Sequence, residues 1–226
     1  SGTSLLTSGL KAIGCDLGEF RDTPDIDNPR GYFEHTEVRQ FNDRLLAHLG
    51  ASWDNWGFYA PEVGLDGPRF AGWHAEAADL VARLYNGSGF WAIKDPRIVT
   101  LLPFWEAVLA QAGHDYRRIL ILRPPDEVAE SQRQRAERRP GPFPVISDHA
   151  PMCALWAVNM LCVLVSLRDD QTLLLRHRDL YDKPQETLRA CAGFLGLVPD
   201  SSLLDDFASE SAVPGYRRVN TSLMDD

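Results

Sequence analysis

Apolar residues recur at intervals of three and four along much of the chain, a spacing that predicts amphipathic helices. One such series runs from 38 to 49, with Thr36 as the expected N-cap and Gly50 just past the end. Asp182 and Gln185 predict a capping box at the start of a late helix. The helices expected on this basis cover residues 5–13, 36–49, 70–84, 100–112, 125–138, 149–167 and 183–195.

Short continuous apolar runs predict strands. Residues 118–122 form the clearest run, of the kind found in parallel strands covered on both faces, and 90–93 and 172–175 form two more. Pro125 suits the first position of the helix that follows the clearest strand. Because strands alternate with helices, the sequence predicts an α/β fold with a mostly parallel sheet. In such a fold, ligands bind at the carboxyl ends of the strands.

The composition is that of a globular protein. The 226 residues are 44% hydrophobic and 24% charged, which is compatible with a single domain over 1–226. The formal net charge of −9 argues against broad binding to nucleic acid. Four cysteines occur singly, without a spacing that suits a metal. We therefore expect buried free thiols in a reducing, cytoplasmic compartment, and no metal. The longest apolar run, 152–167, contains Asn159 and is too short to predict a membrane span.

The chain opens with Ser1-Gly2-Thr3-Ser4, which runs directly into the first predicted helix. Amide groups in the first turn of a helix have no intrahelical partner, the helix dipole is positive there, and the hydroxyls add donors. The stretch therefore predicts a phosphate site. An ordinary helix capped by Ser or Thr is the alternative. Because phosphate loops of this kind normally follow a buried strand, we expect such a strand ahead of Ser1.

A second candidate phosphate site follows the clearest strand. Arg123 comes directly after this strand, and Ser131 lies eight residues later in the next predicted helix, so the two side chains can hold one phosphate between them. A solvated Arg and an ordinary surface Ser are the alternative. Kinases and NTPases of the P-loop class have an Asp after such a strand and a Gly-Lys-Ser/Thr loop, both of which hold Mg²⁺-nucleotide. Arg123 and the Gly2-Thr3-Ser4 stretch occupy these places here.

Taken together, the motifs resemble those of sulfotransferases that use 3′-phosphoadenosine-5′-phosphosulfate (PAPS), in particular bacterial members related to the carbohydrate and tyrosyl-protein branch. The resemblance runs through most of the chain. Its motifs are Ser1–Ser4, Asn28–Glu34, Lys94–Arg97, Arg123 with Ser131, Leu175–Tyr181 and, only loosely, Gly215–Arg218. It implies a P-loop-type three-layer fold with a mostly parallel central sheet. It also implies transfer of a sulfuryl group to an acceptor hydroxyl, with 3′,5′-adenosine bisphosphate (PAP) as product.

The resemblance also implies roles for individual residues. Glu34 is the preferred general base, and His35, whose ordinary pKa is closer to neutrality, is the alternative. Lys94 is expected to meet the bridging oxygen and the sulfonate. Arg97 is left open between an ion pair and a contact with the acceptor. The implied cofactor-binding residues are Ser1, Gly2, Thr3 and Ser4 for the 5′-phosphosulfate, Arg123 and Ser131 for the 3′-phosphate, and Arg217 and Arg218 for the covering segment.

Two other classes of protein remain open from the sequence. One is a P-loop kinase or NTPase, and the other is a nucleotide-binding module that has kept the fold without catalysis. The acceptor is open among sugar hydroxyls, phenols, lipids and small metabolites, with the negative charge favouring a small or neutral one. The oligomeric state is open too. An aromatic group either lines an acceptor pocket or belongs to the core: Trp53, Trp56, Phe58, Tyr59 and Trp73.

Overall fold

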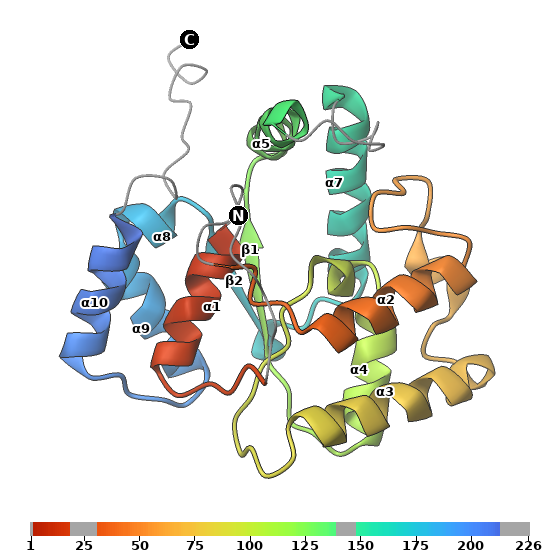
Figure 1. Ribbon diagram of the computed structural model, residues 1–226, viewed down its shortest axis with the longest axis horizontal. Coiled ribbons are helices and arrows are strands. Elements are labelled where there is room, and N and C mark those ends of the chain that lie inside the picture. The colour runs from red at the N-terminus through yellow and green to blue at the C-terminus, as the bar shows by residue number, and fades with distance from the viewer. Residues whose placement is uncertain (1, 19–30, 139–147, 213–226) are drawn as a thin grey trace. The chain divides into compact units, whose positions relative to one another are not determined.

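The computed structural model describes residues 2–18, 31–138 and 148–212 of the chain, which form two compact units (Figure 1). Within these ranges, unit 1 comprises residues 2–13, 119–138, 148–153 and 173–212. Unit 2 comprises residues 14–18, 31–118 and 154–172. The single domain expected from the sequence stays a prediction.

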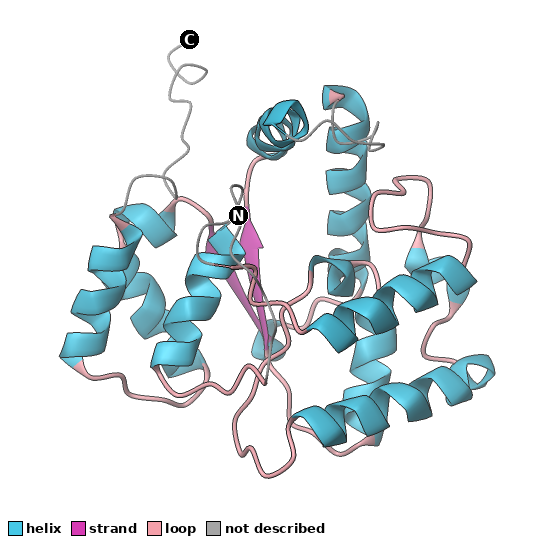
Figure 2. Ribbon diagram, in the orientation of Figure 1, coloured by secondary structure: helices cyan, strands magenta, loops and turns pink. Residues whose placement is uncertain are grey.

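Helices predominate in both units (Figure 2). Unit 1 contains α1 (Gly2–Ala12), most of β1 (Arg118–Leu122), α5 (Pro125–Arg138), the start of α7 (His149–Val165), most of β2 (Thr172–Arg176), α8 (Asp179–Asp182), α9 (Pro184–Phe194) and α10 (Ser201–Ser211). Unit 2 contains α2 (Thr36–His48), α3 (Ala71–Leu84), α4 (Leu102–Gln111) and the rest of α7. It also contains the 3₁₀ helices η1 (Ala60–Val63), η2 (Pro68–Phe70), η3 (Pro96–Val99) and η4 (Asp169–Gln171). None of the helices in the described ranges is long and apolar enough to cross a membrane.

Strands β1 and β2 form a two-stranded parallel sheet, which is the sheet present in the described residues. The helix-rich structure with parallel strands agrees with the predicted α/β class. The third expected strand, 90–93, is reduced to a single parallel bridge. Asp16 N donates to Phe90 O at 3.0 Å, and Ala92 N donates to Asp16 O at 2.9 Å. Strand β1 is half-buried along its length and not fully covered as predicted.

The core of unit 1 is built on the apolar face of α1. Leu5, Leu6 and Leu10 are buried, and α1 packs on α9 and α10. Gly9 makes this close packing possible, because a Cβ atom at Gly9 would lie only 2.8 Å from the Phe207 ring. The apolar spacing read from the sequence therefore identified the buried face of α1 correctly.

The core of unit 2 is aromatic. The Phe41 ring centroid lies 5.7 Å from those of both Phe104 and Trp105, and 5.6 Å from that of Trp73. Asn42 is fully buried beside them and accepts a hydrogen bond of 2.9 Å from Trp105 Nε1. These contacts fix α2, α3 and α4 against one another within the unit.

Two of the predicted helix caps are wrong. The N-cap of α2 is His35, and Thr36 is the first helical residue. Gln185 does not form a capping box, because its side chain donates to Asp205 Oδ1 at 2.6 Å and the N-cap of α9 is Lys183. The predicted end of α2 is confirmed: Gly50 has φ of 70° and donates to a carbonyl of the last turn.

Candidate functional site

The carboxyl ends of β1 and β2 meet in unit 1. His177, directly after β2, donates its backbone N–H to the carbonyl of Leu122 at 2.7 Å, and Arg123 follows Leu122. Burial and the neighbouring positive charge of Arg123 lower the pKa of His177 to about 4. A neutral imidazole and a guanidinium therefore lie together at this edge of the sheet.

The first turn of α1 lies at the same edge. A Cβ atom at Gly2 would be 2.6 Å from His177 Cδ2 and 2.8 Å from Leu180 Cδ1, so the His177 ring packs on the helix start. Gly2, Thr3 and Ser4 belong to α1 itself and form its first turn, in place of a loop ahead of it. His177 is therefore near both the start of α1 and Arg123 within unit 1.

Arg123 is held by a carboxylate of the following helix. Its Nε donates to Glu127 Oε2 at 3.1 Å, and the Arg123 side chain is 16% exposed. Ser131 lies four residues beyond Glu127 in α5, so Glu127 and Ser131 share a helix face, and Arg123 precedes the helix. The sequence analysis missed Glu127, although its distance of four residues from Arg123 is a usual signal of an ion pair.

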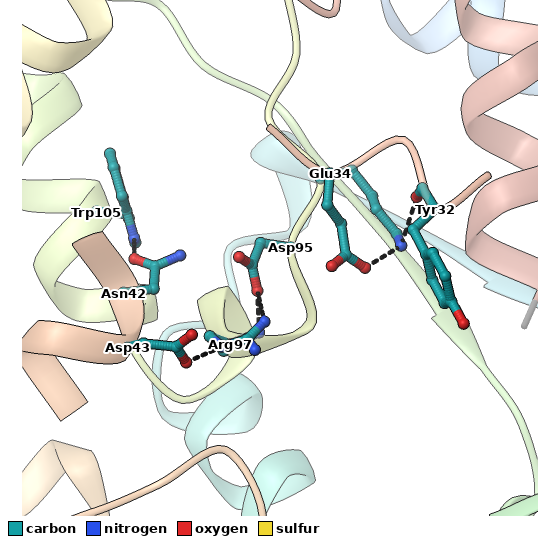
Figure 3. Close-up of polar contacts among 8 residues, drawn as sticks. Tyr32, Glu34, Asn42, Asp43, Asp95, Arg97 and Trp105 are labelled. Atoms are coloured by element: carbon teal, nitrogen blue, oxygen red, sulfur yellow. Dashed lines mark hydrogen bonds and ion pairs between the residues drawn. The ribbon is translucent and has the colours of Figure 1, made fainter. Parts of the chain in front are cut away.

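A buried ion pair occupies unit 2. Lys94 Nζ donates to Glu34 Oε1 at 2.7 Å and to the carbonyl of Tyr32 at 2.8 Å, and both charged side chains are 13% exposed. Figure 3 shows the Glu34 carboxylate and the Tyr32 carbonyl converging on the same amine. Two residues far apart in sequence, which the sequence analysis selected separately as base and cation, are therefore in direct contact.

The backbone around Tyr32 has an uncommon conformation. Gly31 has φ of 87° and Phe33 has φ of 56°. Phe33 is the one non-glycine residue with positive φ among those the structure describes, and a bulky side chain is disfavoured there. The carbonyl that lies between these two residues is the one that accepts from Lys94. Such strain is typical of functional segments.

The structure assigns His35 and Arg97 to structural contacts. His35 is 8% exposed, and its Nδ1 accepts the Glu37 N–H at 3.2 Å, which uses the lone pair that a base would need. Arg97 forms ion pairs with Asp43 and Asp95 (Figure 3). Burial lowers the pKa of Arg97, but the two carboxylates outweigh this effect and leave it raised. His35 therefore serves as the N-cap of α2, whereas Glu34 forms the ion pair with Lys94.

The aromatic residues considered for an acceptor pocket mostly pack on the core. Trp53, Phe58, Tyr59 and Trp73 are partly buried against the aromatic cluster, and Trp56 is 50% exposed. A cavity of about 600 Å³ in unit 2 has a different lining, which includes Leu65, Glu106, Tyr116 and Arg168. Four of the five aromatic residues therefore pack on the core, the alternative given above, and Trp56 does not.

Several predicted site residues lie outside the described part of the chain: Ser1, Asn28, Pro29, Arg30, Arg217 and Arg218. Comparison with known proteins gives no match, whether to protein-family profiles, to curated protein sequences or to solved structures. The contacts of the described residues therefore carry the argument about function.

Proposed function

We propose that this chain is a sulfotransferase that moves a sulfuryl group from PAPS to an acceptor hydroxyl. The observation that carries the proposal is the edge of the sheet in unit 1. There Arg123, the neutral His177 and the first turn of α1 come together. A helix N-terminus beside a guanidinium is suited to bind a phosphate group.

The choice of a 3′-phosphorylated nucleotide rests on Arg123. An Mg²⁺-dependent P-loop enzyme has a metal-holding Asp after the corresponding strand, and a cation at this place would repel the metal. Arg123 instead favours a second phosphate, which PAPS carries at the 3′ position. We also propose that the two parallel strands belong to a P-loop-type three-layer fold, since each is followed by helical residues at its carboxyl end.

In this proposal the donor supplies the activated sulfuryl group, and the side chains supply charge and a base. Glu34 takes the proton of the acceptor hydroxyl, and Lys94 places positive charge where negative charge develops. Their contact at 2.7 Å holds both groups in defined positions before reaction. The buried surroundings strengthen these electrostatic effects. We propose a small or neutral acceptor and a cytoplasmic location.

Glu127 would share the Arg123 guanidinium with a bound phosphate. Its carboxylate bonds to the Arg123 guanidinium, which a 3′-phosphate would also contact. The guanidinium has five N–H donors and Glu127 takes the one on Nε, so the fork of the side chain can bind a phosphate as well. The like charge of Glu127 weakens that binding, and removing the charge should strengthen it.

Calorimetric titration tests this function. We expect PAP to bind without a metal and ATP to bind much more weakly, with or without Mg²⁺. Arg123→Ala should weaken PAP binding, while Glu34→Ala and Lys94→Ala leave it nearly unchanged and each lower turnover about 100-fold or more. Mg²⁺-dependent ATP binding would instead support the kinase or NTPase class. PAP binding without transfer to any acceptor would support a non-catalytic module.

A further inference from the structure

Three side chains with metal-binding atoms, none of them assigned a role above, converge in unit 1. They are Asp126 in the first turn of α5 and His149 and Cys153 in the first turns of α7. Nε2 of His149 lies 3.1 Å from Asp126 Oδ1 and 4.0 Å from Cys153 Sγ. All three ligand atoms lie within 4.8 Å of one another.

These separations are close to those of a tetrahedral metal site. Bonds of about 2.0–2.3 Å from zinc to nitrogen, oxygen and sulfur place neighbouring ligand atoms about 3.3–3.7 Å apart at the tetrahedral angle. The separations to Nε2 of 3.1 and 4.0 Å bracket that range. The side chains of His149 and Asp126 are 59% and 70% exposed, so small rotations of both would bring the ligand atoms into tetrahedral positions.

The positions of the ligands in the fold suit a metal as well. His149 and Cys153 are four residues apart on α7, so both side chains lie on one face of the helix, and Asp126 comes from a different element. The sequence analysis expected no metal. It found neither a cysteine pair nor a Cys/His spacing suited to one, and Asp126 lies more than twenty residues before His149 in the chain.

We propose that Asp126, His149 and Cys153 bind a Zn²⁺ ion that links the start of α5 to the start of α7, with water in the fourth position. Zinc accepts nitrogen, sulfur and oxygen ligands, whereas Mg²⁺ and Ca²⁺ prefer oxygen ligands alone. The ion would take the place of the proton in the contact between His149 and Asp126. It would also keep Cys153 as a thiolate, so that binding releases protons.

Titration with Co²⁺, which takes the same geometry as Zn²⁺ and absorbs light, tests the site on the full chain. We expect a near-ultraviolet sulfur-to-cobalt band and tetrahedral visible bands, which saturate with one ion per chain and disappear when Zn²⁺ is added. Cys153→Ser should abolish the sulfur band. His149→Gln and Asp126→Asn should each weaken Zn²⁺ binding about tenfold or more in competition with a chromophoric chelator.

Asp148→Asn is the matched control, since this exposed carboxylate adjoins His149 in sequence and is not one of the three ligands. It should leave the cobalt spectrum unchanged. Circular dichroism establishes that each variant is folded. A sulfur band that survives in Cys153→Ser, or the lack of any such band in the folded parent protein, would overturn the proposal. The proposed sulfotransferase activity does not enter either outcome.

Discussion

Removing one partner of the ion pair between Glu34 and Lys94 should destabilise the fold. Each side chain is 13% exposed, so removing one partner leaves the other charge largely shielded from water. We therefore expect Glu34→Gln and Lys94→Met each to destabilise the protein, and the double variant to be destabilised by less than the sum of the two single effects.

The magnitude follows from the geometry. With Nζ and Oε1 at 2.7 Å, the charge centres are about 4 Å apart, and their attraction is about 4 kcal/mol at an effective dielectric constant of about 20. The loss of hydration on burial offsets much of this gain. Removing one partner of a buried pair nevertheless costs about 3–5 kcal/mol, because an uncompensated charge remains. The Tyr32 carbonyl still accepts from Lys94 in Glu34→Gln, so we expect about 2–3 kcal/mol for that variant.

Urea denaturation of the four proteins in the double-mutant cycle measures the coupling, which we expect to be about 1–3 kcal/mol. The pair of Glu37 and Arg83 is the matched control. Its atoms are 2.8 Å apart, but its side chains are 46% and 59% exposed. Glu37→Gln should leave the free energy of unfolding unchanged within error. Equal effects of Glu34→Gln and Glu37→Gln would refute the reasoning, because burial is the property that distinguishes the two pairs.

Three further predictions follow from contacts in unit 1. Calorimetry should show that Glu127→Gln strengthens PAP binding several-fold and that Arg123→Ala weakens it about tenfold or more. An unchanged affinity in both variants would remove Arg123 from the phosphate site. The pKa of His177 falls from 6.5 to about 4 on folding, so stability is fully present above about pH 6.5. As the pH falls towards 4, the free energy of unfolding should decrease by up to about 3 kcal/mol. Urea denaturation at several pH values should show this slope in the parent protein and a smaller slope in His177→Gln. Gly9→Ala should lower stability by about 1–3 kcal/mol because its methyl group would clash with Phe207, whereas Gly72→Ala, with open space around it, should raise the melting temperature slightly.

The sequence predicted the elements that depend on local pattern. The bounds of β1 are those expected from its apolar run, and α5 begins at Pro125 as expected. These predictions succeeded because strand and helix periodicity are properties of neighbouring residues. The run at 90–93 has the same apolar character as β1, yet it forms one bridge, with Asp16. Strand formation there depends on a partner far away in the chain, which the run itself does not specify.

Among the candidate site residues too, local contacts were foreseeable from the sequence and long-range contacts were not. Glu34 and Lys94 were selected by motif, and the ion pair between them depends on folding that brings together two residues 60 positions apart. His35 was considered because of its ordinary pKa, but a cap is a local contact that the adjacent helix start made foreseeable. Of these three side chains, two form the ion pair and the third caps the start of α2.

Phe33 explains why the geometry of the pair could not be read from the sequence. Left-handed backbone is expected at glycine, and Gly31 meets that expectation, whereas nothing about a phenylalanine indicates φ of 56°. A conformation of this kind costs of order 1–3 kcal/mol and persists only where surrounding contacts stabilise it. The bond from Lys94 to the Tyr32 carbonyl is such a contact. The same amine therefore contacts both the strained backbone and the Glu34 carboxylate, so that one side chain joins the local backbone conformation to the ion pair.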